Sequence, residues 1–259
     1  MEIKGRSAIV TGSSSVIGIG AETARAIAAK GCNVVINYVN NEKGAEETVA
    51  ACRSHGVKSF AIKGDVSKDQ DCKNIVQETI KEWGRIDVLV NNAATTKPVP
   101  QSDLDALTAE EFLRIYSVNV VGTFQMTRAS APFLRLSGDA AVVNISSIVA
   151  IRYIGVPYVS YGVTKAGILQ LTQSIALEYA EKNIRANSIL PGLMNTPMII
   201  EPLKYAYANG DVDKMLEIRH NQVPMKKMGD AWDVAYAALF LASDEANTSP
   251  VPSSWWMAD

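Results

Sequence analysis

The chain has 259 residues, of which 47% are hydrophobic and 20% charged, with a formal net charge of −2. This composition is ordinary for a globular protein, and the length allows one α/β domain or two small ones. The near-neutral balance of mixed charges argues against nucleic acid or a membrane surface as the main partner.

The termini and cysteines exclude further classes. The chain starts Met1-Glu2-Ile3-Lys4 and reaches Gly12 after a short apolar run, which does not resemble a signal peptide. No stretch approaches the roughly 20 apolar residues of a membrane-spanning helix. The three cysteines are odd in number and lack CxxC spacing, so we expect neither a disulfide framework nor a metal site. We therefore expect a cytoplasmic protein.

In chain order, short apolar runs alternate with helical patterns. We predict strands over residues 7–11, 33–38, 58–63, 86–91, 140–146 and 185–190. We predict helices over residues 21–30, 42–54, 70–83, 108–134, 161–179 and 231–242.

This order predicts the fold class. The strands are almost continuously apolar, as expected when helices cover both faces of a sheet, and alternating β and α units indicate a parallel, doubly wound sheet. No linker interrupts the pattern. We therefore predict α/β architecture of the Rossmann-like kind, as one domain over residues 1–259.

The first β–α junction is rich in glycine. It reads Thr11-Gly12-Ser13-Ser14-Ser15-Val16-Ile17-Gly18-Ile19-Gly20. Glycines let the backbone approach a pyrophosphate, and the helix N-terminus that follows offers free N–H groups and about +0.5 charge. An ordinary βα loop that needs glycines only for a tight turn is the competing interpretation.

Tyr161 and Lys165 lie four residues apart in a helical pattern, so their side chains share one helix face. A tyrosine titrates near ~10, and a neighbouring ammonium lowers that pKa. Such a pair suits proton exchange with a carbonyl or an alcohol. A chance surface pair is the alternative.

Several motifs in order resemble the classical short-chain dehydrogenase/reductase family, over almost the whole chain to about Thr248. The shared elements are the glycine loop, Gly64-Asp65-Val66, Asn91-Asn92-Ala93-Ala94, Asn119, Ser146-Ser147, Tyr161/Lys165, and Pro191-Gly192 with Thr196.

The resemblance implies roles. The catalytic residues would be Asn119, Ser147, Tyr161 and Lys165. Ser147 would hydrogen-bond the substrate oxygen, Tyr161 would pass the proton, and Asn119 would hold a water of a proton relay behind Lys165. The cofactor-binding residues would be Gly12, Ser14, Ser15, Gly18, Ile19, Gly20, Asn37, Tyr38, Asp65, Val66, Asn91, Ala93, Tyr161, Lys165, Pro191, Gly192 and Thr196.

The chain departs from the family pattern in three places. Val16-Ile17 lengthens the glycine loop from three intervening residues to five, and Ala94 replaces a glycine. The atypical tail, residues 247–259, has Pro250 and Pro252, which oppose a central strand. We therefore expect the last strand of the sheet to be doubtful.

The cofactor is expected to be NADP(H), with NAD(H) left open. An acidic residue after the second strand would favour NAD, and the chain has Asn37-Tyr38-Val39-Asn40-Asn41 there. No arginine or lysine directly follows to bind a 2′-phosphate, and Lys43 is the nearest candidate.

The implied reaction interconverts a carbonyl and a secondary alcohol by hydride transfer. The predicted pocket walls favour an apolar or aromatic small molecule, with Lys97 and Arg152 as isolated charges. A 3-oxoacyl-thioester reductase of fatty-acid synthesis and a non-catalytic homologue remain alternatives. We expect a homo-oligomer through the helices over 108–134 and 161–179, a dimer at least, with a tetramer weakened by the tail.

Overall fold

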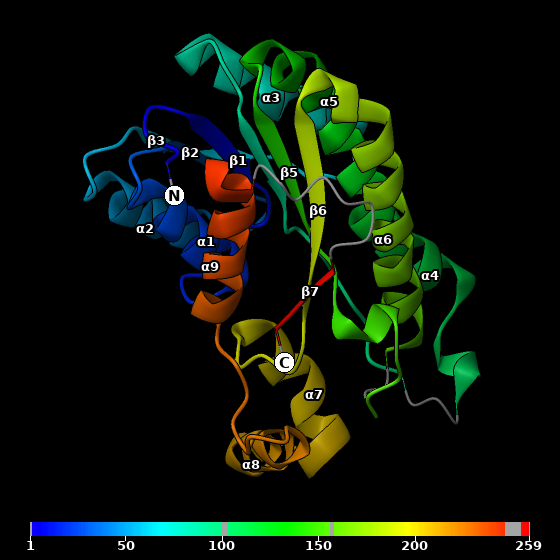
Figure 1. The fold of residues 1–259 in the computed structure, drawn as a ribbon. Helices are drawn as coiled ribbons and strands as arrows, with labels where there is room; N and C mark the ends of the chain where they lie inside the picture. The colour runs from blue at the N-terminus through cyan, green and yellow to red at the C-terminus, as the bar shows by residue number, and fades with distance from the viewer. Residues whose placement is uncertain (1, 100–102, 156–157, 247–254, 259) are drawn as a thin grey trace.

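The computed structural model describes residues 2–99, 103–155, 158–246 and 255–258 (Figure 1). Its centre is a seven-stranded sheet in the order β3-β2-β1-β4-β5-β6-β7, and every neighbouring pair is parallel. The strands are β1 (Ser7–Val10), β2 (Asn33–Tyr38), β3 (Ser59–Lys63), β4 (Val88–Asn91), β5 (Ala140–Ile145), β6 (Ile184–Pro191) and β7 (Trp255–Ala258). The order reverses direction between β1 and β4, which is where α/β sheets of this kind bind ligands.

Helices cover both faces of the sheet, as the apolar strands predict (Figure 1). One face carries α1 (Ile19–Ala28), α2 (Glu42–Arg53) and α9 (Ala231–Ala242). The other carries α3 (Asp69–Trp83), α5 (Gly122–Ser137) and α6 (Val159–Tyr179). Alternate residues of one strand enter opposite cores: Val10 joins the first and Ile9 the second.

The predicted helix over residues 108–134 is three segments in the structure. These are α4 (Ala109–Tyr116), a π-helical turn (Ser117–Val121) and α5, which runs on to Ser137. The π turn contains Asn119, and such turns frequently occur at functional sites. Thr108 caps α4 by accepting a hydrogen bond from Glu111 N, as an N-cap threonine does.

The expectation that the last strand is doubtful is wrong. β7 pairs in parallel with β6, with Ser188 opposite Trp255 and Pro191 opposite Ala258. Pro250 and Pro252 precede β7 and lie outside the described residues. β7 is also an edge strand with one neighbour, so fewer of its amides must form hydrogen bonds within the sheet than those of a central strand.

Two helices were not predicted from the sequence. They are α7 (Pro197–Ala208) and α8 (Val212–Gln222), which lie beyond the carboxyl ends of the strands at the bottom of Figure 1. Throughout the described residues, no helix is both long and apolar enough to cross a membrane. The same residues contain no cluster of three or more His, Cys, Asp or Glu arranged to hold a metal ion.

Arg185 connects the sheet to α9. This β6 residue is buried, and its guanidinium donates to Leu241 O at 2.6 Å and to Ser243 O at 3.0 Å. Carbonyls at the C-terminal end of a helix have no partner within the helix, so the arginine satisfies groups that are otherwise unpaired.

We expect Arg185→Met to lower the free energy of unfolding by about 2–4 kcal/mol, because two charge-assisted hydrogen bonds are lost in a buried place. Chemical denaturation measures the change. Lys182→Met, at an exposed position, is the control and should cost less than about 0.5 kcal/mol. Equal losses in the two variants would contradict the proposed connection.

Candidate active site

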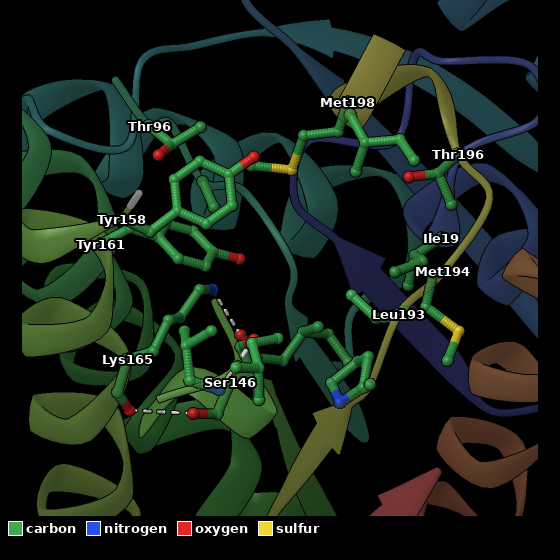
Figure 2. Close-up of a pocket in the computed structure, with 18 of the residues that line it drawn as sticks. Ile19, Thr96, Ser146, Tyr158, Tyr161, Lys165, Leu193, Met194, Thr196 and Met198 are labelled. Carbon is green, nitrogen blue, oxygen red and sulfur yellow. Dashed lines mark hydrogen bonds between the residues drawn. The ribbon is translucent and has the colours of Figure 1, made fainter. Parts of the chain in front are cut away.

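Helix α6 brings the predicted tyrosine and lysine to the carboxyl end of β5 (Figure 2). The Lys165 Nζ donates to Ile145 O at 2.6 Å and lies 5.3 Å from the centroid of the Tyr161 ring. In return, Ser146 Oγ donates to Lys165 O at 2.8 Å. Both serines line the pocket, but Ser146 is buried and bonded to α6, whereas Ser147 is partly exposed.

Burial shifts both titrating groups toward their neutral forms. Desolvation raises the pKa of the Tyr161 phenol, and the neighbouring Tyr158, whose ring centroid is 5.4 Å away, adds to the rise. Desolvation lowers the pKa of Lys165 to about 7. The sequence-based expectation was that Lys165 lowers the tyrosine pKa. In the protein alone, burial outweighs that effect.

Asn119 is completely buried, and its side-chain amide is fully engaged. Its Oδ1 accepts from Thr95 N at 2.8 Å, while Nδ2 donates to Thr95 O at 3.0 Å and to Thr164 Oγ1 at 2.9 Å. These bonds connect the π-helical turn to the loop after β4 and to α6. Asn119 therefore connects the π-helical turn and the loop after β4 to the helix that carries Tyr161.

A cleft of about 660 Å³ runs along the carboxyl edge of the sheet, within the size range of ligand sites. The predicted cofactor residues that line it are Gly12, Ser14, Ser15, Gly18, Ile19, Gly20, Asn37, Tyr38, Asp65, Val66, Ala93 and Thr196. Helix α1 begins beside this cleft with Gly18 as its N-cap and without a side-chain cap, which leaves first-turn N–H groups for an anion.

Close packing explains two glycines of the loop. Gly12 has φ +61°, and a Cβ there would lie 2.7 Å from Ala93 Cα. A Cβ on Gly20 would lie 2.5 Å from Asn92 Nδ2. Hydrogen bonds then fix the loop from the β2 side, because Asn37 Oδ1 accepts from Gly12 N and Asn41 Nδ2 donates to Ser14 O. The result is a rigid, bare backbone surface that suits a pyrophosphate.

Some predicted residues have other surroundings. Asn91 lies beneath the cleft, where its Nδ2 donates to Thr127 Oγ1 and Asn144 Oδ1, and it lines neither the cleft nor the substrate pocket. The next residue, Asn92, lines both and was missed. Asp65 accepts hydrogen bonds from Ser67 N and Oγ, and these bonds close a turn. Asp65 does not cap α3, because that helix begins only at Asp69.

A second pocket adjoins the cleft and shares Ile19, Asn92, Ala94, Thr196 and Met198 with it. Its volume is about 100 Å³. Figure 2 labels further lining residues, among them Tyr158, Tyr161, Lys165, Leu193 and Met194. The lining also includes Ser147, Pro191, Gly192, Ile199 and Arg219. Tyr158 is one of the pocket-wall residues expected from the sequence, whereas Arg219 lies within the predicted wall segment 193–225 but was not named. Lys97 and Arg152, the charges expected there, are not among the lining residues.

Comparison with known proteins agrees with this geometry. Residues 12–249 match the profile of a family described as enoyl-(acyl carrier protein) reductase. The 3β-hydroxysteroid dehydrogenase 1 of Eggerthella lenta is 38% identical over 250 residues, 95% of this chain and 90% of that protein. The 3-oxoacyl-[acyl-carrier-protein] reductase of Staphylococcus epidermidis is 35% identical over 242 residues, 93% of either chain. The crystal structure of levodione reductase has a TM-score of 0.90 at 31% identity, covering 99% of this chain and 96% of that one.

The chain therefore belongs to the short-chain dehydrogenase/reductase family, and it is an oxidoreductase. Members of this family use NAD(H) or NADP(H). The residues present fit such a cofactor, because the bare glycine backbone, the start of α1 and the long cleft occur together. The fit does not distinguish the two cofactors, since Asn37, Tyr38 and Asn41 carry no charge.

The two additional loop residues form a turn that projects outward. Gly18 N donates to Ser15 O at 2.7 Å, so Val16 and Ile17 are the central residues of a β-turn. Ile17 is 62% exposed, and neither residue lines the cleft. The turn lengthens the loop without occupying the cofactor cleft.

We therefore expect deletion of Val16 and Ile17 to leave cofactor affinity unchanged or tighter, because the deletion removes residues that do not face the cleft. Fluorescence titration with NADPH and NADH measures this. Ile17→Ser is the matched control, since it keeps the loop length. A large loss of affinity on deletion alone would show that the longer loop is part of the phosphate site.

Proposed function

We propose that the protein interconverts a carbonyl compound and a secondary alcohol, with Tyr161 as the general acid in reduction and the general base in oxidation. The arrangement of Ser147, Tyr161 and Lys165 around one small pocket, next to a long glycine-lined cleft, is the observation that supports this most. NADP(H) is the favoured cofactor, with NAD(H) as the alternative.

In this proposal the substrate oxygen lies between two hydroxyl groups. Ser147 Oγ donates a hydrogen bond to it, and the Tyr161 phenol transfers its proton as the oxygen becomes an alkoxide. A bound nicotinamide would supply the hydride for reduction and accept it in oxidation. The glycine loop, Asp65 and Thr196 would bind the cofactor, and Lys165 would contact its ribose.

The shifted pKa values are compatible with this chemistry. An alkoxide is a much stronger base than a phenolate, so a neutral Tyr161 can donate to it although burial has raised its pKa. Lys165, with its pKa lowered to about 7, can exchange a proton near neutral pH. Asn119 positions Thr95 and Thr164 by direct bonds, and its role in a water relay remains a prediction.

We expect Tyr161→Phe to lower turnover by at least ~10², because the transferable proton is lost while the ring is kept. Cofactor affinity should survive. Steady-state kinetics and fluorescence titration measure the two effects. Tyr236→Phe is the control, since this tyrosine is 58% exposed on α9 outside both clefts. A Tyr161→Phe enzyme that keeps most of its activity would refute the mechanism.

A 3-oxoacyl-thioester reductase is the second candidate, favoured by the relative from Staphylococcus epidermidis. A panel of ketones, secondary alcohols and an acetoacetyl thioester, assayed with both cofactors, separates the two. Turnover confined to the thioester would favour this candidate. Absence of binding of either cofactor would favour a non-catalytic homologue.

We further propose that the protein is a homo-oligomer. The surface of α4, α5 and α6 exposes Leu113, Tyr116, Phe124, Val163 and Leu177. Isolated exposed apolar residues are normal, but several on neighbouring helices suit an interface between copies. Because β7 forms, the reason given for a weakened tetramer no longer applies, and both dimer and tetramer fit. The three buried free cysteines suit the proposed cytoplasmic location.

We expect Phe124→Glu to shift the assembly toward smaller species, because it places a charge in the proposed interface. Light scattering over a concentration series measures this. Met225→Glu is the control, since Met225 is 80% exposed and lies outside these helices. A wild-type protein that stays monomeric at every concentration would refute the interface.

A further inference from the structure

Arg219 is a buried cation in the substrate pocket. It lies on α8, is 3% exposed, and lines the pocket together with Ser147 and Tyr161. Its Cζ lies 5.6 Å from the centroid of the Tyr207 ring on α7. Among the described residues, neither its Nε nor its Nη1 has a hydrogen-bond partner.

This burial is unusual for an arginine on a short helix at the rim of the fold. Arginine normally keeps its guanidinium in water while its stem covers apolar surface, and burying an unpaired charge is costly. The acidic residues of the same helix, Asp213 and Glu217, are exposed and stand on another face. Contact with the Tyr207 ring offsets part of the cost, but it leaves the N–H donors unsatisfied.

The other described residues of the pocket supply no counter-charge for Arg219. The charged residues that line it, within the described part of the chain, are Lys165 and Arg219, and both are basic. Burial raises the pKa of the neighbouring Tyr158, while the Arg219 charge opposes the rise. The Tyr207 hydroxyl is also buried without a partner among the described residues. As far as the described residues go, the site thus offers positive charge and hydroxyl groups but no carboxylate.

We propose that Arg219 binds a carboxylate of the substrate, so that the substrate is a small oxo acid or the matching hydroxy acid. A carboxylate is the acceptor that a buried guanidinium pairs with best. The proposal rests on the proposed function, since it assigns a second subsite beside the carbonyl subsite of Ser147 and Tyr161.

The pocket limits the size of that substrate. A water-sized group needs about 10–15 Å³ of such volume, so about 100 Å³ holds roughly seven to ten of them. That suits an oxo acid of four to six carbons. The apolar walls at Leu193, Met194 and Ile199 would contact its carbon chain, between the carbonyl at one end and the carboxylate at the other.

The test compares each oxo acid of four to six carbons with its primary amide, a neutral analogue of the same shape. Binding is measured by calorimetry with and without oxidised cofactor, which cannot reduce the ligand. The wild type should bind at least one acid tenfold or more tighter than its amide, as expected for charge-assisted hydrogen bonds. Arg219→Met and Arg219→Gln should bring the ratio to within about twofold. Lys214→Met, which removes an exposed cation from the same helix, should keep the wild-type ratio.

The outcomes separate the two proposals. A wild-type ratio near one, failure of every acid to bind, or a ratio unchanged in both folded Arg219 variants would overturn the carboxylate site and leave Arg219 as packing for Tyr207. Selective binding of an acid that is not turned over with either cofactor would support this site but count against the proposed function. Turnover of neutral ketones without binding of any acid would support the function and refute the site.

Discussion

The site depends on a reciprocal connection between β5 and α6. Lys165 reaches from α6 to the carbonyl of Ile145, and Ser146 reaches back to the carbonyl of Lys165. Both bonds are buried, where a lost partner costs most. Because Ser147 follows one anchored residue and Tyr161 precedes the other by one helical turn, this pair of bonds sets the position of both hydroxyl groups.

Charge in the pocket follows from the same burial. A helix and a strand that meet closely leave little water around Lys165, so its pKa falls to about 7, and the Tyr161 phenol is kept neutral. Arg219 cannot adapt in this way, because a guanidinium stays protonated. The lysine can therefore lose its charge in the free protein, whereas the arginine stays charged and finds no counter-charge among the described pocket residues.

The sequence predicted the scaffold well because its signals are local. Nearly continuous apolar strands and glycine-rich turns mark the sheet, and the order of motifs marks Ser147, Tyr161 and Lys165. The failures have a common physical reason, which is that they depend on tertiary contacts. β7 follows two prolines yet pairs with β6 as an edge strand. Asn91 bonds to Asn144, whereas Asn92 lines the cleft. The sequence does not distinguish Arg219 from a surface arginine, and only its contact with Tyr207 on α7 shows that it is buried.

The two helices that the sequence did not predict, α7 and α8, pack separately from the rest of the fold. α7 and α8 lie beyond the sheet and bury a separate small core around Leu203 and Met215, so their sequence is not constrained by the two large cores. Proteins similar to this chain are named for a 3β-hydroxysteroid, a 3-oxoacyl-[acyl-carrier-protein] and levodione. In the proposed mechanism, α6 and β5 position the groups that transfer the proton, while α7 and α8 add side chains to the wall of the substrate pocket. Among the described residues of α7 and α8, the charged side chain that lines the pocket is Arg219, so the search for a substrate should consider the charge of the candidate molecule as well as its shape.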